Sequence, residues 1–239
     1  MDARLATPEK MKKLSEINIR PLRIAFDHYS QKETYEKAIR LAAENGIRDL
    51  SNYLLYNFKD KPEELYHRMK LNVDLCSELD VTIYSFPMKY HPIDDPDYFS
   101  NRDFIGKNWN RKYIRAIQAV LNATKGKIGR GQNFFSAAFG KNVTEFKEIL
   151  EMPEALIIHR YKYDKNKREE YNKEYEGSTA ENDGVTDEWR KKFASLNEKQ
   201  LEATKNIISQ NQFTDETCNT GDNDIDDVLK YYQVRRDSR

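Results

Sequence analysis

Apolar and polar residues alternate along residues 21–27, PLRIAFD. A period of two predicts a β-strand that buries only one of its faces. The apolar positions are Leu22, Ile24 and Phe26, and the positions between them are Arg23, Ala25 and Asp27. We therefore expect Asp27 to face solvent or a ligand.

A helix is predicted directly after this strand. Ser30 and Glu33 have the spacing of a capping box, in which each side chain bonds a free backbone N–H of the first turn. Apolar residues then recur at helical spacing from Tyr35 to Ala42, and Asn45-Gly46 provides a left-handed stop. Residues 21–46 thus form one predicted strand–helix unit.

The same pattern returns in residues 51–79, where the apolar run SNYLLYNF precedes a charged turn and a second helix. Asp60 is the predicted N-cap, Pro62 suits the first turn because its missing N–H costs nothing there, and Glu63 completes the box. Apolar residues share one face of this helix, namely Leu65, Met69, Val73 and Cys76. We expect Cys76 to be a buried apolar residue and not a ligand or nucleophile.

A third strand, VTIYSFPMKY, spans residues 81–90, and Pro87 within it indicates a sheet end or a distortion. Consecutive strand–helix units with short connections predict parallel strands, in a layered α/β sheet or a barrel. In both architectures, ligands bind beyond the carboxyl ends of the strands. Those ends carry Asp27-His28, Asn57–Asp60 and Met88–His91.

The overall composition points to no particular ligand. The chain of 239 residues balances 40 basic against 40 acidic residues, so no bulk field favours nucleic acid or an anionic membrane. Its two cysteines, Cys76 and Cys218, are too few and too far apart for a disulfide framework, and the sequence has neither a signal peptide nor a long apolar run. We expect a protein of the reducing cytoplasm without a membrane anchor.

Three stretches, FDHYSQKETYEKAIRLAAENGI, NYLLYNFKDKPEEL and VTIYSFPMKYHPI, resemble the carboxyl-terminal half of a radical S-adenosylmethionine (radical SAM) protein. That family has a Gly-x-Glu-Ser-like strand end, a Gly-x-x-Gly-Glu-Thr-x-Glu-like turn and a strand leading to Pro-x-x-Gly-Thr. Here Ala25 and Asp27 stand at the Gly and Glu positions, Asn57–Glu63 at the turn, and Pro87–Pro92 at the last segment. The resemblance covers residues 1–160. It implies an α/β fold, the C-terminal part of a partial (β/α)6 TIM-like barrel with parallel strands, followed by a mostly helical C-terminal extension.

The resemblance implies S-adenosylmethionine as cofactor and radical chemistry on an unknown substrate. In that family, three cysteines usually spaced Cys-x-x-x-Cys-x-x-Cys hold a 4Fe-4S cluster. This chain has no such motif, and its two remote cysteines cannot replace it. The family places these ligands ahead of the strand at Met1, so about 60–90 residues of the barrel are expected to be missing, at ~30 residues per unit. The chain would be a truncated or split half that is not catalytic alone, or a relic. A sheet that is only part of a barrel exposes an unpaired strand edge. We therefore expect the chain either to aggregate or to need a partner, which would be a separate N-terminal half.

Four residues are carried over from the resemblance as contacts to the cofactor: Asp27, Asn52, Ser85 and Met88. Asp27 comes first because it matches the family's acidic position, and its structural alternative is a pair with Arg23, Arg4 or another inward charge. For Asn52 and Ser85, ordinary backbone hydrogen bonding is the preferred interpretation over contact with the cofactor. We call the edge of the sheet at the carboxyl ends of the strands the rim. The histidines at the rim, His28 and His91, are expected to be solvated loop residues, and no catalytic or metal-binding residue is assigned.

A non-enzymatic binding module for RNA or protein is the alternative function. Residues 102–130 carry eight Lys or Arg against one Asp, interleaved with Trp109 and Tyr113, a combination that can grip phosphates and stack on bases. The same segment has an apolar helical side that needs a core. A solvated basic face on a packing helix is therefore the preferred interpretation.

The predicted domain organisation has five parts. Residues 1–92 form the barrel part, 93–161 a helical region packed on it, 162–185 a charged linker, 186–210 a helical pair, and 211–239 an acidic, disordered tail. Ser195 and Glu198 are expected to cap the second helix of the pair.

Overall fold

The structure is a computed structural model that describes residues 1–17, 19–96, 103–128, 131–158 and 180–233. The chain divides into two compact units. Unit 1 comprises Met1–Trp109 and Thr124–Lys147, and unit 2 comprises Asn110–Ala123 and Glu148–Arg239. The predicted helical region, residues 93–161, therefore contributes to both units, and the predicted charged linker lies mostly outside the described residues.

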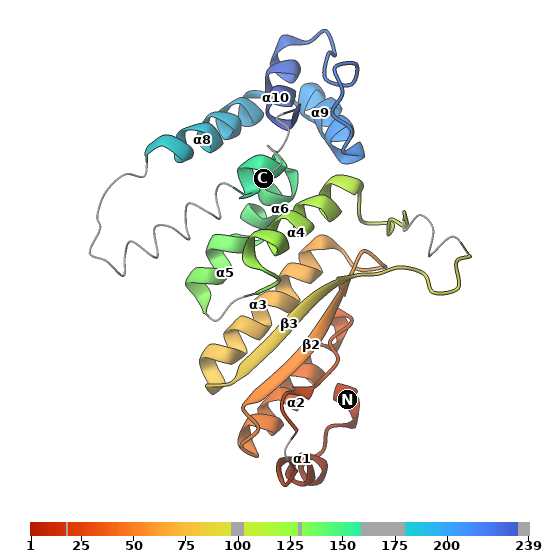
Figure 1. Cartoon of the computed structure of the whole chain (residues 1–239), viewed down its shortest axis with the longest axis vertical. Helices are drawn as coiled ribbons and strands as arrows, with labels where there is room; N and C mark the ends of the chain where they lie inside the picture. The colour runs from red at the N-terminus through yellow and green to blue at the C-terminus, as the bar shows by residue number, and fades with distance from the viewer. Residues whose placement is uncertain (18, 97–102, 129–130, 159–179, 234–239) are drawn as a thin grey trace. The chain divides into compact units, whose positions relative to one another are not determined.

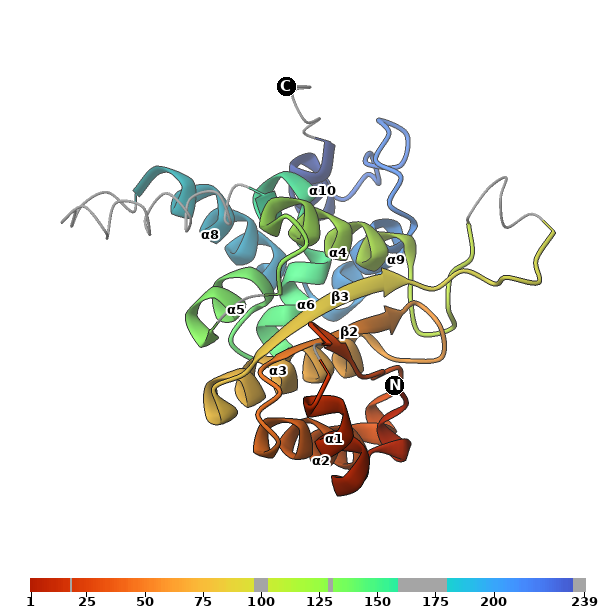
Figure 2. The ribbon, with the colours of Figure 1, turned by 60° about the horizontal axis from the view of Figure 1, so that its bottom comes forward.

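Unit 1 is built on a parallel sheet of three strands in sequence order, β1 (Leu22–Arg23), β2 (Asp49–Tyr56) and β3 (Thr82–Lys89). Helix α2 (Lys32–Glu44) connects β1 to β2, and helix α3 (Pro62–Leu79) connects β2 to β3. Both helices lie on the same side of the sheet (Figures 1 and 2). The predicted parallel α/β arrangement is confirmed.

Strand β1 is shorter than predicted, because only Leu22 and Arg23 pair with β2 in the ladder. The predicted alternation nevertheless continues to Asp27, with the apolar residues buried and Arg23, Ala25 and Asp27 exposed. One further bond joins the Ile24 N–H to the Ser51 carbonyl at 3.0 Å. Beyond it, the carbonyls of Phe26 and Asp27 accept hydrogen bonds from the Arg68 side chain of α3.

Pro87 does not end the sheet. Strand β3 runs through it to Lys89, and Pro87 stands in register with Leu54 of β2. Among the described strands β3 is the last of the order, so the missing N–H of the proline breaks no ladder on its outer side.

The chain begins beside β1. The amino group of Met1 donates to the Arg23 carbonyl at 2.6 Å, and the Ala25 N–H donates to the Met1 carbonyl at 3.0 Å. This pair of bonds is the pattern of a parallel bridge, so Met1 covers part of the outer edge of β1. A 3₁₀ turn, η1 (Ala3–Leu5), and helix α1 (Pro8–Ser15) then lead back to β1, with Thr7 as the N-cap of α1.

The predicted caps of both sheet-connecting helices were wrong. A 3₁₀ turn, η2 (Tyr29–Gln31), precedes α2, and the Ser30 N–H bonds the His28 ring, so no box forms between Ser30 and Glu33. Helix α3 is capped at Lys61, whose N–H donates to the Glu64 carboxylate at 2.7 Å. Asp60 is free for another role because the cap lies one residue later. The glycine stop of α2 is confirmed, since Gly46 has φ of +78°.

Apolar residues between the sheet and its two helices form the core of unit 1. The rings of Phe26 and Tyr35 stack with centroids 4.2 Å apart, which fixes α2 against the end of β1. Leu50 and Leu54 of β2 and Leu65 and Met69 of α3 are fully buried beside them. Full burial of each such side chain contributes about 1.5–3 kcal/mol, so this layer accounts for much of the stability of the sheet.

Two shorter helices complete unit 1, α5 (Gln132–Phe139) and the first part of α6 (Val143–Glu151). Tyr66 of α3 packs against Phe135 and Phe146, with ring centroids 5.4 and 5.2 Å away. The Tyr66 hydroxyl donates to the Gly140 carbonyl at 3.2 Å. These contacts hold α5 and α6 on the outer side of α3.

Unit 2 is helical and includes α4 (Arg111–Thr124), α8 (Ala180–Ser195), α9 (Glu198–Gln210) and α10 (Asn223–Gln233). Helix α10 corrects the prediction of a disordered tail, because apolar residues at helical spacing bury one side of it: Ile225, Val228, Leu229 and Tyr232. Helix α9 is capped by a box between Asn197 and Gln200, so the predicted Ser195–Glu198 cap was also wrong. None of the described helices is long and apolar enough to cross a membrane.

Helix α4 buries a lysine in unit 2. Lys112 is 1% exposed, and its Nζ has no hydrogen-bond partner among the described residues. Burial lowers the pKa of Lys112 to about 7, against the opposing effect of Glu154 and Glu151 nearby. The folded protein therefore keeps this side chain neutral above pH 7.

Replacement of Lys112 by methionine is expected to stabilise the protein at neutral pH. Above the ordinary pKa of 10.5, lysine is neutral in both states. Between that pH and about 7, the unfolded chain binds a proton that the folded chain does not bind. Wild-type stability therefore falls as the pH is lowered, by about 1.4 kcal/mol per pH unit.

Lys112→Met removes this loss. We expect a gain in the free energy of unfolding on the order of a few kcal/mol at pH 7 and almost none near the ordinary lysine pKa. Urea unfolding of the wild type and the variant, at pH 7 and near the ordinary lysine pKa, measures this gain in the free energy of unfolding. A difference between the proteins that is the same at both pH values would contradict the burial of a neutral lysine.

Candidate functional site

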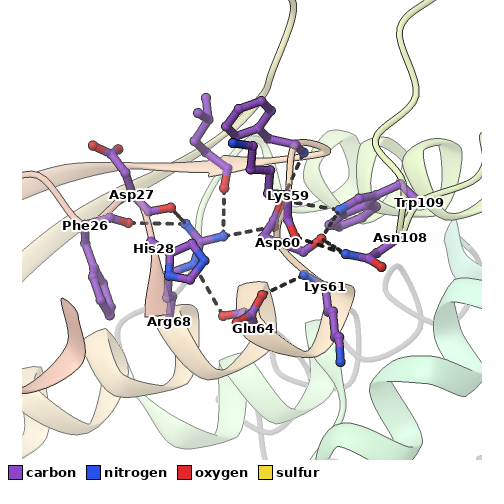
Figure 3. A network of polar contacts seen from close by, with 12 residues as sticks. Phe26, Asp27, His28, Lys59, Asp60, Lys61, Glu64, Arg68, Asn108 and Trp109 are labelled. Atoms are coloured by element: carbon purple, nitrogen blue, oxygen red, sulfur yellow. Dashed lines mark hydrogen bonds and ion pairs between the residues drawn. The ribbon is translucent and has the colours of Figure 1, made fainter. Parts of the chain in front are cut away.

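The carboxyl ends of β1 and β2 are joined by the buried guanidinium of Arg68, on α3 (Figure 3). Its Nη1 donates to the carbonyls of Phe26 and Asp27 at 3.2 and 3.0 Å. Its Nη2 donates to the Leu55 carbonyl at 2.7 Å and to the Asp60 carboxylate at 3.1 Å. One side chain thus satisfies the carbonyls that follow β1 and one near the end of β2.

Asp60 completes this network. Its carboxylate also accepts the Phe58 N–H at 3.0 Å and the indole N–H of Trp109 at 3.3 Å. Burial raises the pKa of the Asp60 carboxyl, and burial lowers the pKa of Arg68, so the ion pair exists at a desolvation cost. The surrounding hydrogen bonds offset that cost, as a buried ion pair requires.

Asn57 locks a distant segment onto the same rim. It is fully buried with φ of +69°, a conformation that asparagine tolerates better than most residues. Its side-chain amide donates to the Phe104 carbonyl at 3.0 Å, and its side-chain oxygen accepts the Gly106 N–H at 2.9 Å. Gly106 lies so close that an added Cβ would stand 2.4 Å from the Phe58 carbonyl. Residues 104–106 are therefore held against the turn that follows β2.

Aromatic rings pack against one another at this part of the rim. Phe58 and Tyr90 have ring centroids 4.3 Å apart, and Tyr90 and Phe104 have centroids 5.4 Å apart. Asn108 donates to the Lys59 carbonyl at 3.0 Å beside them. The protein's own segment thus occupies the rim beyond β2 and β3, where the sequence predicted space for a ligand.

The second face of the sheet is not covered by any described helix of unit 1. In unit 1, α2 and α3 cover only the other face, and in Figure 1 no helix of this unit lies in front of the strands. Large side chains project from the uncovered face and are 41–47% exposed, namely Tyr53, Tyr84, Phe86 and Met88. Tyr53 and Phe86 stand in register on neighbouring strands, with ring centroids 5.8 Å apart. We call this surface the open face; it also carries Arg23, Ala25, Asp27, Asp49, Ser51 and Leu55.

The four predicted cofactor contacts are divided between the two faces. Asp27 and Met88 are on the open face, toward the carboxyl ends of their strands, and Figure 3 shows the Asp27 carboxylate pointing away from the Arg68 network. The Asp27 carboxylate forms no ion pair with Arg23, Arg4 or any other described residue. The alternative that Asp27 is a structural ion pair is therefore not what the structure shows.

Asn52 and Ser85 lie on the helix-covered face instead. The Asn52 amide donates to the Tyr35 hydroxyl at 2.8 Å, and the Asn72 amide of α3 donates to Ser85 Oγ at 2.7 Å. Both residues are less than 7% exposed. Their side chains thus serve a polar cluster between the sheet and the helices, and they do not reach the open face.

The rim histidine His28 is structural, because its Nδ1 lies 2.8 Å from Ser30 Oγ in the turn before α2. Cys76 is partly buried, and burial raises the pKa of its thiol. In the described parts of the chain, no three His, Cys, Asp or Glu side chains are grouped as metal ligands. The residues present therefore do not fit an iron–sulfur cluster.

The predicted nucleic-acid segment buries its indole and one of its lysines, whereas its other described basic side chains are exposed, namely Lys107, Arg111, Arg115, Lys125 and Lys127. Trp109 is 6% exposed, with its N–H bonded to the Asp60 carbonyl at 3.0 Å, and Lys112 is buried in unit 2. Arg115 pairs with the Glu154 carboxylate at 3.0 Å. Arg102 and Arg130 lie outside the described residues. A stacking indole and a phosphate-binding Lys112 are therefore not available at the surface of this fold.

Sequence reasoning missed the two polar residues of α3 that face the sheet, Arg68 and Asn72. Both stand next to apolar positions of the buried stripe, Met69 and Val73. Their position on the helix was therefore a signal that they are buried against the sheet. An arginine inside an apolar stripe is buried only if it has several partners, and those partners come from β1, β2 and the turn between β2 and α3.

Loss of the Arg68 guanidinium should unfold the sheet more readily than loss of an exposed arginine. We expect Arg68→Met to lower the free energy of unfolding by about 3–5 kcal/mol, because Asp60 and three carbonyls would stay buried without a partner. Arg48→Met removes an exposed arginine that donates to one carbonyl, and it should cost less than about 1 kcal/mol. Equal urea midpoints for the two variants would show that Arg68 does not stabilise the rim.

Gly106 offers a second test of the rim. Gly106→Ala should lower stability by about 1–3 kcal/mol, because the added methyl group would overlap the Phe58 carbonyl. Gly184→Ala in α8 meets no atom within 4 Å and should be neutral or stabilising. Thermal unfolding of both variants compares them. A Gly106→Ala variant as stable as Gly184→Ala would mean that residues 104–106 do not pack on this turn.

Comparison with known proteins identified no relative. No protein-family model matches the sequence, no curated protein matches it, and no solved structure matches it. The function of this chain must therefore be argued from the open face and the rim themselves.

Proposed function

We propose that the chain forms one wall of a partial TIM-like barrel of the radical SAM type and helps to bind S-adenosylmethionine and a substrate. The observation that carries this proposal is the parallel sheet, of which the described helices of unit 1 cover one face only. In a (β/α) barrel the helices form the outer layer, and the uncovered face is the interior. The strand order β1-β2-β3 is the order that consecutive units of such a barrel have.

The open face has side chains suited to an adenosyl group. A purine offers apolar flat surfaces, and Tyr53 and Phe86 present exposed rings. Ribose hydroxyls and an ammonium group donate hydrogen bonds, and the Asp27 carboxylate, which pairs with no described residue, accepts them. Asp27 and Met88 are therefore retained as candidate contacts, and Asn52 and Ser85 are not.

The chain by itself would bind and orient the cofactor but would not cleave it. S-adenosylmethionine supplies an adenosyl radical when a reduced cluster cleaves it, and the described residues do not provide the ligands of that cluster. A further polypeptide segment with three cysteines would have to supply them. Such a segment would close the barrel against this wall.

Equilibrium dialysis with S-adenosylmethionine tests the proposal. We expect saturable binding that Asp27→Ala weakens about tenfold, the loss of one charge-assisted hydrogen bond. Asp49→Ala is the matched control, because it removes a carboxylate from the same face at the amino end of β2. Binding that is absent, or that both variants weaken equally, would contradict a cofactor site at the carboxyl end of β1.

A further inference from the structure

The open face carries opposite charges that pair with no other described residue. The side chains of Arg23 and Asp27 are both exposed, and neither forms a hydrogen bond or an ion pair with another described residue. They flank Ala25 on the same side of the chain, two residues before it and two residues after it. A positive and a negative group thus lie at equal spacing about one small residue.

The rest of the open face is arranged in rows that cross the three strands. Arg23 stands in register with Ser51, and Ser51 with Tyr84. In the middle row, Tyr53 stands in register with Phe86, and in the last row Leu55 with Met88. Arg68 holds the carbonyls of Asp27 and Leu55 beside each other, so Asp27 belongs to the last row. Ala25 accordingly belongs to the middle row.

We propose that the open face is an interface between two copies of this chain, packed face to face about a two-fold axis that runs along the middle row, Ala25–Tyr53–Phe86. This axis lies across the strands and exchanges the first row with the last. Arg23 of each copy then faces Asp27 of the other, and Tyr84 faces Met88. The surface is complementary to itself, which a two-fold interface requires.

The dimensions of stacked sheets suit these pairs. Two sheets that pack face to face lie about 10 Å apart, and their side chains interdigitate between them. An extended arginine and a short aspartate from opposite sheets together bridge roughly that distance. The exposed rings of Tyr53 and Phe86 would fill the centre, where an interface gains most from burial of aromatic side chains.

Charge argues against nucleic acid as the occupant of this face. Two carboxylates, Asp27 and Asp49, stand on it with the one guanidinium of Arg23, so the charge there would repel phosphates. A second sheet also explains why a parallel sheet has one bare side, since such sheets normally have both faces covered.

The inference does not rest on S-adenosylmethionine, although it uses the same face as the proposed function. Cofactor binding is read by dialysis and dimerisation by mass, so either can fail without the other. Three short strands form a small interface, so we expect a dissociation constant in the micromolar range. The measurement should therefore extend to about 100 μM protein.

Sedimentation equilibrium of the full chain, without ligand, tests the dimer. We expect a reversible monomer–dimer equilibrium whose dissociation constant rises roughly tenfold in Arg23→Asp and in Asp27→Arg, since each change turns two attractive pairs into two repulsive ones. The double variant, Arg23→Asp with Asp27→Arg, restores attraction and should dimerise as the wild type does. Lys37→Asp makes the same charge change as Arg23→Asp on the exposed side of α2 and should have no effect.

The restored double variant separates an interface from damage to the fold. A monomer at every concentration would overturn the inference. A dimer that both single variants leave unchanged, or that the double variant fails to restore while its circular dichroism spectrum matches the wild type, would overturn it as well. Open-ended oligomers would equally contradict a closed two-fold interface.

Discussion

The buried guanidinium of Arg68 is the constraint on which the rest of unit 1 depends. Beyond Arg23 and Ser51 the ladder between β1 and β2 stops, and the carbonyls there would lie buried without donors. Arg68 supplies those donors from the middle of α3 and takes its counter-charge from Asp60, in the turn that precedes the same helix. The end of β1, the end of β2 and the start of α3 are therefore fixed by one side chain. Any ligand of the open face would meet a rim whose backbone is already rigid.

This constraint separates the two places where the sequence allowed a site. The turn after β2 is occupied by the chain itself, through Asn57, Gly106 and the ring of Trp109. The open face, in contrast, has exposed rings, and its Arg23 and Asp27 side chains pair with no other described residue. The Arg68 network explains both the structural role of the rim and the binding role of the open face. A rigid rim holds the strands in register, and this register aligns the rows of side chains on the open face. The wall of a barrel and the face of a dimer are two ways to cover that surface.

The strand and helix order could be predicted from apolar spacing, because the alternation in PLRIAFD and the helical stripe of α3 depend on neighbours in the sequence. The caps were misplaced by one or two residues, since Asp60 has a better partner in Arg68 than in the helix end. The face on which a strand residue lies was predicted for Asp27 but not for Asn52 or Ser85, whose partners, Tyr35 and Asn72, come from different helices. Helix α10 was not predicted because the acidic composition of its segment indicated disorder, although four apolar residues at helical spacing are buried in it. Local patterns in the sequence could not predict the role of a side chain whose partner lies far away along the chain.

Tyrosine-selective nitration of the dilute chain, read by mass spectrometry, tests most directly whether the open face is uncovered. Tyr53 and Tyr84 are 46% and 41% exposed on that face, whereas Tyr35 and Tyr56 are at most 2% exposed on the other. We predict rapid modification of the first pair and protection of the second. Protection of Tyr53 and Tyr84 at concentrations where the chain is monomeric would mean that the chain covers this face itself, and it would contradict the open face on which both proposals depend.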